Sequence, residues 1–130
     1  MLKKKNINQK DKRGYILDIF VNSPKDHCSL VTFAKGATRG NHFHKKSIQY
    51  TFILDGKLRM FISKVNRKGK IIGKVTKKIV IKNDLITHKP YTAHAFKAIK
   101  SSKILAFADG KRGGKNYEQD TFRLKKKLVI

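Results

Sequence analysis

The chain contains little cysteine, few acidic residues and no long apolar run. Cys28 is the single cysteine among 130 residues, which excludes an intrachain disulfide and favours a reducing compartment such as the cytoplasm. No apolar run approaches the roughly 18 residues that cross a membrane. The N-terminal stretch "MLKKKNINQKDK" is basic but has no apolar segment behind it, which argues against a signal peptide. We therefore expect a cytoplasmic protein with no membrane partner.

The shortage of acidic side chains leaves a large positive charge. Lys and Arg number 32 against 8 Asp and Glu, a formal net charge of +24. Such an excess favours an anionic partner, which could be nucleic acid, acidic lipid or a phosphorylated small molecule. However, the lysines are spread along the whole chain and form no compact basic block with interleaved aromatics. A coding bias towards A and T would produce the same composition, so both explanations stay open, and nucleic acid is not the expected partner.

Helical periodicity of useful length is also missing. Short runs rich in β-branched and aromatic residues alternate instead with turn signals, and the Asp-Gly pair at Asp55 and Gly56 predicts a β-hairpin. This pattern predicts an all-β sandwich or barrel in a single domain. We expect residues 13–130 to form that domain, residues 1–12 to form a flexible or exchanged arm, and "GKRGGKN" to form a flexible loop.

Histidines are the candidate chemical groups. His42 and His44 lie at i and i+2 in a strand-like run, so they are expected to share one face. Gln49 can rejoin them only if the chain turns at "KKS", and His94 would converge from a distant segment. Burying two adjacent imidazoles costs stability unless each finds a partner, so a functional role is favoured over simple packing.

The remaining two histidines are weaker candidates. His27, in "SPKDHCS", is expected to lie in a loop without a functional role. His88 is expected near the rim of a pocket, and the sequence does not decide whether it contacts a substrate.

The spacing from Gly36 through His42, His44 and Gln49 to Gly56 resembles the first motif of the cupin superfamily, which carries glutamate where this chain has glutamine. The segment "NDLITHKPYTAHAF" resembles the second cupin motif more loosely, because its usual glycines are missing. This resemblance implies a single-domain cupin jelly roll, an antiparallel all-β fold that is usually dimeric.

Longer segments narrow the resemblance. "DKRGYILDIF" is similar to the opening of the dTDP-4-dehydrorhamnose 3,5-epimerase superfamily, and "RGNHFHKKSIQ" to a segment of nucleotide-sugar 3,4-ketoisomerases. "GATRGNHFH" resembles the C-terminal cupin of bifunctional capsular-polysaccharide enzymes as closely, and "YEQDTFR" fits the tails of both groups. The resemblance implies an isomerase or epimerase, acting as a homodimer on a nucleoside-diphosphate keto-deoxy sugar in surface polysaccharide biosynthesis. The subfamily, the sugar and the nucleotide stay open.

Two chemistries fit these histidines. In the preferred one no cofactor is required, and His42 and His44 act as base and acid on the carbon beside a ketone. In the other, a divalent Zn, Fe, Mn or Ni ion is held by His42, His44 and His94, with Gln49 as a poor fourth ligand. The second chemistry would suit a metal-dependent cupin that acts on another small molecule.

Basic and polar side chains are the candidates for substrate binding. Arginine recognises phosphate oxygens bidentately, and the resemblance places several such residues around a diphosphate. The candidate substrate-binding residues are Arg13, Arg39, Lys45, Gln49, Arg59 and Tyr91. A non-enzymatic sugar-binding or nucleic-acid-binding module remains a further alternative.

Overall fold

The computed structural model describes residues 1–110 and 119–130. Most of the predicted "GKRGGKN" loop, and the first two residues of "YEQDTFR", lie outside the described residues. The described chain forms strands and no helix, and it therefore contains no helix that is long and apolar enough to span a membrane.

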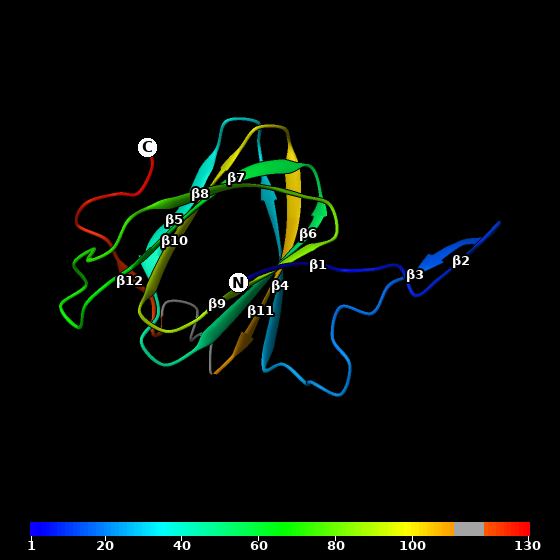
Figure 1. The fold of residues 1–130 in the computed structure, drawn as a ribbon, viewed down its shortest axis with the longest axis horizontal. Helices are drawn as coiled ribbons and strands as arrows, with labels where there is room; N and C mark the ends of the chain where they lie inside the picture. The colour runs from blue at the N-terminus through cyan, green and yellow to red at the C-terminus, as the bar shows by residue number, and fades with distance from the viewer. Residues whose placement is uncertain (111–118) are drawn as a thin grey trace.

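Two five-stranded antiparallel sheets form the body of the molecule. The first sheet has the order β1 (Leu2–Lys4), β9 (Asp84–His88), β6 (Ile48–Asp55), β11 (Ser102–Asp109) and β4 (His27–Phe33). The second has the order β12 (Phe122–Arg123), β5 (Thr38–Phe43), β10 (Thr92–Ala98), β7 (Lys57–Lys64) and β8 (Thr76–Ile81). The strands curve around a common centre (Figure 1), which confirms the predicted all-β jelly-roll sandwich.

A hydrophobic core fills one end of the space between the sheets. In β7 the side chains of Leu58 and Met60 are buried while Arg59 between them is exposed, as the alternation of a strand requires. They pack with seven other buried hydrophobic residues: Phe33, Ile53, Val80, Ile86, Phe96, Ala98 and Ile104. Because this cluster occupies one end, polar groups can be placed at the other.

The prediction that Asp55 and Gly56 close a hairpin is wrong. The strands on either side, β6 and β7, belong to different sheets, so the turn carries the chain across the sandwich. Gly56 has a φ of +103°, and a Cβ there would lie 2.6 Å from the Cα of Ser102. Both strands bury apolar residues on their inner faces, and crossing between sheets lets both faces share one core.

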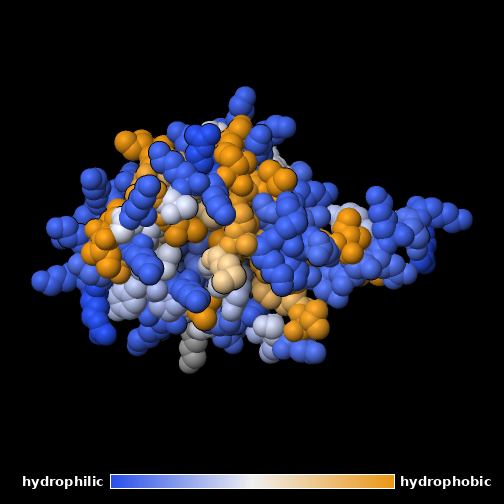
Figure 2. Space-filling view, in the orientation of Figure 1, coloured by the Kyte–Doolittle hydropathy of each residue, from blue (hydrophilic) through white to orange (hydrophobic). Residues whose placement is uncertain are grey.

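The N-terminal segment makes two separate structures. β1 pairs with the edge strand β9, and the ammonium group of Met1 donates to the carbonyl oxygen of Thr87 at 2.9 Å. β2 (Gln9–Asp11) and β3 (Gly14–Ile16) form a hairpin that projects from the body (Figure 1). Figure 2 shows apolar side chains on this projection within a largely hydrophilic face, and Ile16 there is 58% exposed. Exchange of the first dozen residues with a second chain stays a prediction.

Candidate functional site

A β-bulge in β5 brings two distant segments together. His94 of β10 pairs with His42 and Ala95 pairs with Gly40, so Asn41 is the extra residue. Gly40 and Asn41 adopt φ values of +102° and +57°. A Cβ on Gly40 would lie 2.7 Å from the carbonyl oxygen of His94, so only glycine allows β5 and β10 to approach this closely.

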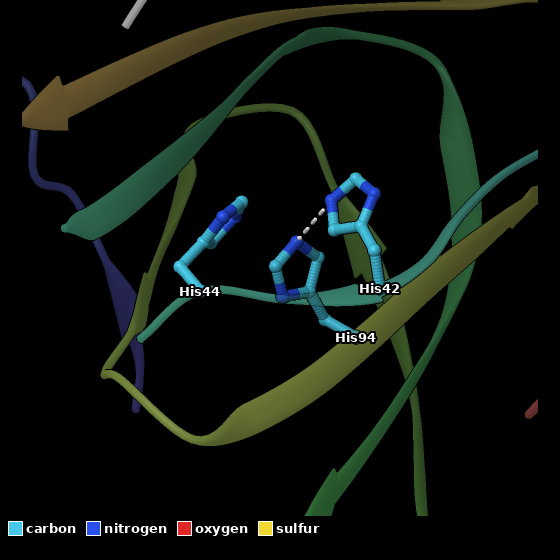
Figure 3. A group of neighbouring side chains, drawn as sticks. All are labelled: His42, His44 and His94. Atoms are coloured by element: carbon cyan, nitrogen blue, oxygen red, sulfur yellow. Dashed lines mark hydrogen bonds between the residues drawn. The ribbon is translucent and has the colours of Figure 1, made fainter. Parts of the chain in front are cut away.

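Three histidines gather beside this bulge (Figure 3). Nε2 of His42 lies 3.1 Å from Nε2 of His94. The ring of His44, one residue beyond β5, lies 5.1 Å from that of His42 and 5.3 Å from that of His94, between centroids. One nitrogen from each of the three rings falls within 4.8 Å of the others, so the predicted convergence of the cluster is confirmed.

A chain of hydrogen bonds continues from His44 into the first sheet. Nδ1 of His44 donates to the carbonyl oxygen of Asp120 at 2.9 Å, and Nε2 lies 3.1 Å from Oε1 of Gln49. Nε2 of Gln49 donates to Oγ1 of Thr51 at 3.2 Å, and that hydroxyl lies 3.0 Å from Nε2 of His88. The hydrogen bond from Nδ1 to the Asp120 carbonyl oxygen fixes the orientation of the His44 ring.

His88 and His94 form the most deeply buried part of the histidine cluster. Their rings stack with centroids 4.1 Å apart, and both side chains are at most 1% exposed. Burial lowers the pKa of His88 to about 3 and lowers that of His94 well below the usual value, and the neighbouring histidines add to both effects. Both rings are therefore neutral at pH 7. The expectation that His88 lies at a pocket rim is wrong, because it is fully buried beneath His94.

The Nδ1 atoms of the His88 and His94 rings are buried. Neither has a hydrogen-bond partner of standard geometry among the described residues. The backbone of Thr92 lies near the His94 ring and partly opposes the fall in its pKa, although no hydrogen bond of standard length and angle reaches Nδ1. An unpaired ring nitrogen is far less costly to bury when the ring carries no charge, which agrees with the low pKa values.

A cavity of about 550 Å³ opens beside the cluster, between the two sheets. His42, Gln49 and His94 form one part of its wall, whereas His44 is fully buried behind that wall. The exposed side chains of Arg39, Arg123 and Lys127 lie around it, and no Asp or Glu is among the described residues that line it. The arrangement suits an anionic ligand whose reacting end reaches the histidines.

Two of the predicted substrate-binding residues reach this cavity. Gln49 lies in its wall, next to the histidines. Arg39 also lines it, and its guanidinium group is held by a hydrogen bond from Nε to the carbonyl oxygen of Thr32 at 3.1 Å and by the ring of Phe33, 5.5 Å away.

The other four predicted substrate-binding residues lie outside the cavity wall. Arg13 sits in the turn of the projecting hairpin, where it pairs with Asp11, and Arg59 is exposed on β7. The Nζ atom of Lys45 lies 4.0 Å from the ring centroid of Phe122. Tyr91 has a φ of +58° and donates its N–H to the carbonyl oxygen of His44 at 2.8 Å. A role for these four in substrate binding stays a prediction.

One known protein family matches most of the chain. The family described as "Polysaccharide biosynthesis C-terminal domain" matches residues 9–122. The chain belongs to this family. A comparison with curated protein sequences finds no match.

Solved structures share the fold of this polysaccharide biosynthesis C-terminal domain. The dTDP-4-dehydrorhamnose 3,5-epimerase from Sulfolobus tokodaii superposes with a TM-score of 0.75 at 21% identity, covering 88% of this chain and 72% of that one. A mutant of the 3,4-ketoisomerase QdtA from Thermoanaerobacterium thermosaccharolyticum, in complex with TDP-4-keto-6-deoxyglucose, gives 0.74 at 19% identity, covering 95% and 86%. The capsular polysaccharide assembling protein CapF from Staphylococcus aureus gives 0.65 at 18% identity, and the match covers 95% of this chain but only 33% of CapF. These similarities confirm the predicted cupin fold.

Two features of the site in this family member were not predicted from the sequence. Asp120 accepts hydrogen bonds from the backbone N–H groups of Lys45, Lys46 and Ser47 and from the Ser47 hydroxyl, at 2.7 to 2.9 Å. Burial alone would raise the pKa of Asp120, but these hydrogen bonds lower it overall. The "KKS" turn was visible in the sequence, whereas its pairing with a carboxylate more than 70 positions away was not.

The second feature is His27. It begins β4 rather than lying in a loop, so the loop expectation is wrong. Its ring lines the cavity together with Ser29, whose Oγ lies 3.1 Å from Nε2 of His27. The alternation of "HCSLVTF" could have revealed this, because His27, Ser29, Val31 and Phe33 occupy every second position of one strand and share its inner face.

Proposed function

We propose that this chain is an isomerase or epimerase that acts on a nucleotide-linked keto-deoxy sugar, with His42 removing a proton from the carbon beside the ketone. The observation that carries the proposal is the position of His42. It is half-buried in the cavity wall, and its Nε2 lies 3.1 Å from Nε2 of the buried His94. The family and the sugar-nucleotide enzymes with the same fold support the substrate class.

The pairing of His42 with His94 suits a general base. A proton beside a ketone is acidic enough to be removed when the developing enolate is stabilised, and histidine exchanges protons near neutral pH. Because burial keeps His94 uncharged, it can accept a hydrogen bond from His42 once that ring has taken up the proton. In this arrangement His94 orients and stabilises His42, while the buried His44 positions the cluster through Asp120 and Gln49.

The basic wall of the cavity suits a nucleoside diphosphate. Guanidinium groups bind phosphate oxygens in a bidentate manner, and Arg39 and Arg123 both line the cavity with Lys127. No Asp or Glu side chain stands among the described lining residues to repel a diphosphate. We assign the diphosphate to this basic end and the sugar ring to the end formed by His42 and Gln49.

Deuterium exchange tests the proposal. The protein is incubated in D2O with TDP-4-keto-6-deoxyglucose, the sugar nucleotide bound by the QdtA mutant, and the protons flanking the ketone are followed by NMR. We expect loss of a flanking proton signal with the wild type. His42→Gln should slow it by about 10²-fold or more, the range of a positioned acid–base group. Cys28→Ser, an exposed position on the opposite face of β4, is the matched control.

A metal-dependent reaction is the second candidate, favoured by the closeness of three imidazole nitrogens, within 4.8 Å of one another. His42, His44 and His94 would hold the ion, and the hydrogen bond from Nδ1 of His44 to Asp120 is typical of a metal-bound imidazole. The fit is incomplete, because Gln49 supplies no charge and Nδ1 of His94 has no partner of standard geometry among the described residues. A bound divalent ion would polarise the ketone oxygen.

Metal analysis separates the two candidates. The purified protein is stripped with a chelator, its metal content is measured, and exchange is assayed before and after Zn, Fe, Mn or Ni is restored. Activity that survives complete chelation supports the metal-free reaction. Activity that returns only with a metal supports the second candidate.

A further inference from the structure

The cavity has a second histidine on the wall opposite His42. His27 comes from β4 in the first sheet, whereas His42 comes from β5 in the second. Both rings line the same cavity and both are half-buried. Facing sheets of a sandwich lie roughly 10 Å apart, a separation that leaves room for a sugar ring between side chains projecting from each.

The cavity floor between His27 and Gln49 carries small side chains. In the register of the first sheet, Ala108 pairs with His27 on one side and with Gln49 on the other. Ala106 pairs in the same way with Ser29 and Thr51. Since neighbouring strands are about 4.8 Å apart, His27 and Gln49 stand about 10 Å apart across a strip that carries only methyl groups. The strip keeps the space in front of His27 open.

The ring of His27 is also held in place. Nε2 lies 3.1 Å from Oγ of Ser29, two residues along the same inner face. A hydroxyl can either donate to or accept from an imidazole, so Ser29 can hold the ring in both of its protonation states. This pairing of an imidazole with an orienting partner lies inside the cavity of the proposed reaction, and neither residue belongs to the hydrophobic core, which borders the cavity through Phe33, Phe96 and Ile104.

We propose that His27 is a second acid–base residue, which returns a proton to the substrate after His42 has removed one. This inference rests on the proposed function. His42 takes the proton of the carbon beside the ketone, and the electrons of that C–H bond form the carbon–carbon double bond of the enolate. Protonated His27 then gives its proton to carbon, the enolate electrons form the new C–H bond, and the carbonyl group is restored.

Two proton carriers on opposite walls explain how a product can differ from its substrate. A single base that removes the proton and returns it to the same face of the same carbon regenerates the substrate. A donor on the other wall inverts the carbon, or it protonates the former carbonyl carbon while a hydroxyl proton passes between the two oxygens. One proton is taken and one is returned in each case, and exchange with solvent resets the two rings.

The test separates proton removal from product formation. His27→Gln is incubated with TDP-4-keto-6-deoxyglucose in D2O, and both exchange beside the ketone and appearance of product are followed by NMR. We expect exchange to continue, because His42 is intact, while product formation falls by about 10²-fold or more. Ser29→Ala should lower product formation by about 10-fold without affecting exchange. Cys28→Ser, with its side chain outside the cavity, should match the wild type in both measurements.

Other outcomes would overturn the assignment. Product formed by His27→Gln at the wild-type rate would remove His27 from the reaction and leave the proposed function intact. Loss of both exchange and product, in a variant that keeps its circular dichroism spectrum and still binds TDP, would show that His27 is not a separate proton donor. If His27→Gln folds poorly, equal product rates for Ser29→Ala and wild type would overturn the proposal. Failure of the wild type to exchange or form product would instead count against the proposed function itself.

Discussion

Nδ1 of His44 donates to the backbone carbonyl of Asp120 at 2.9 Å, and the carboxylate of the same Asp120 accepts from the turn that follows His44. His44 and the turn that follows it are thus both tied to one residue near the C-terminus. The position of the histidine cluster therefore depends on Asp120, which lies outside the motif from Gly36 to Gly56.

Asp120→Ala should therefore destabilise the fold. The substitution leaves three backbone N–H groups and a hydroxyl without their acceptor. We expect the free energy of unfolding to fall by about 2 kcal/mol, as for the loss of a helix-capping carboxylate. Urea denaturation followed by circular dichroism measures this. Asp26→Ala is the matched control, because within the described part of the chain the Asp26 carboxylate accepts one backbone hydrogen bond, from Gly110. Equal losses for the two variants would contradict the role given to Asp120.

Gly40→Ala should be more damaging than alanine at another glycine of positive φ. At Gly40 the new Cβ would lie 2.7 Å from the His94 carbonyl oxygen, whereas at Gly36, with a φ of +83°, it would meet nothing within 4 Å. Both variants carry backbone strain of about 1 kcal/mol, and Gly40→Ala should lose roughly 2 kcal/mol more because the strands must separate. Thermal and urea unfolding of both variants checks this difference. Similar stabilities would show that close approach of β5 and β10 is not required.

The buried His88 should make stability fall in mild acid. Its pKa is about 3 in the folded protein, so it stays neutral there, while the unfolded chain takes up a proton below its ordinary pKa of 6.5. The contribution is full above pH 6.5 and declines as the pH falls towards 3. From pH 7 to pH 5 it amounts to about 2 kcal/mol. His88→Gln, which can still pair with Thr51, should lose this part of the dependence.

Urea unfolding of the wild type and His88→Gln at a series of pH values measures the difference. His94 has a similarly lowered pKa, so part of the wild-type slope should remain in the variant. Identical slopes for the two proteins would mean that His88 titrates normally in the folded state.

Arg123 and Arg67 offer a matched test of the basic wall. Arg123 lines the cavity, whereas Arg67 is exposed in a turn and is not among the residues that line it. Each Gln substitution removes one positive charge from a chain of formal charge +24. We expect Arg123→Gln to weaken TDP binding by about 10-fold, and Arg67→Gln to change it little, because a local phosphate contact outweighs distant charge in salt. Isothermal titration calorimetry decides this, and equal weakening would favour a general charge effect.

The sequence predicted the all-β fold and the closeness of His42 and His44, because strand alternation and motif spacing are local patterns, whereas the meeting with the distant His94 agrees with the resemblance to two cupin motifs. It failed where a position depends on pairing between distant strands. The Asp55–Gly56 turn has hairpin chemistry, yet the two strands join different sheets. His88 was expected near the pocket rim but is buried against His94, and His27 was expected in a loop but lines the cavity. Both positions depend on how β9 and β4 pair within the first sheet, which the sequence alone does not show. The predicted homodimer and cytoplasmic location stay predictions.

The central claim is that His42 removes a proton from the carbon beside a ketone. Its most direct test is the initial rate of deuterium exchange beside the ketone of TDP-4-keto-6-deoxyglucose, measured by NMR for wild type and His42→Gln at saturating substrate. The account predicts a wild-type rate that exceeds the variant's by about 10²-fold or more. Equal rates for two folded proteins that both bind the nucleotide would contradict it.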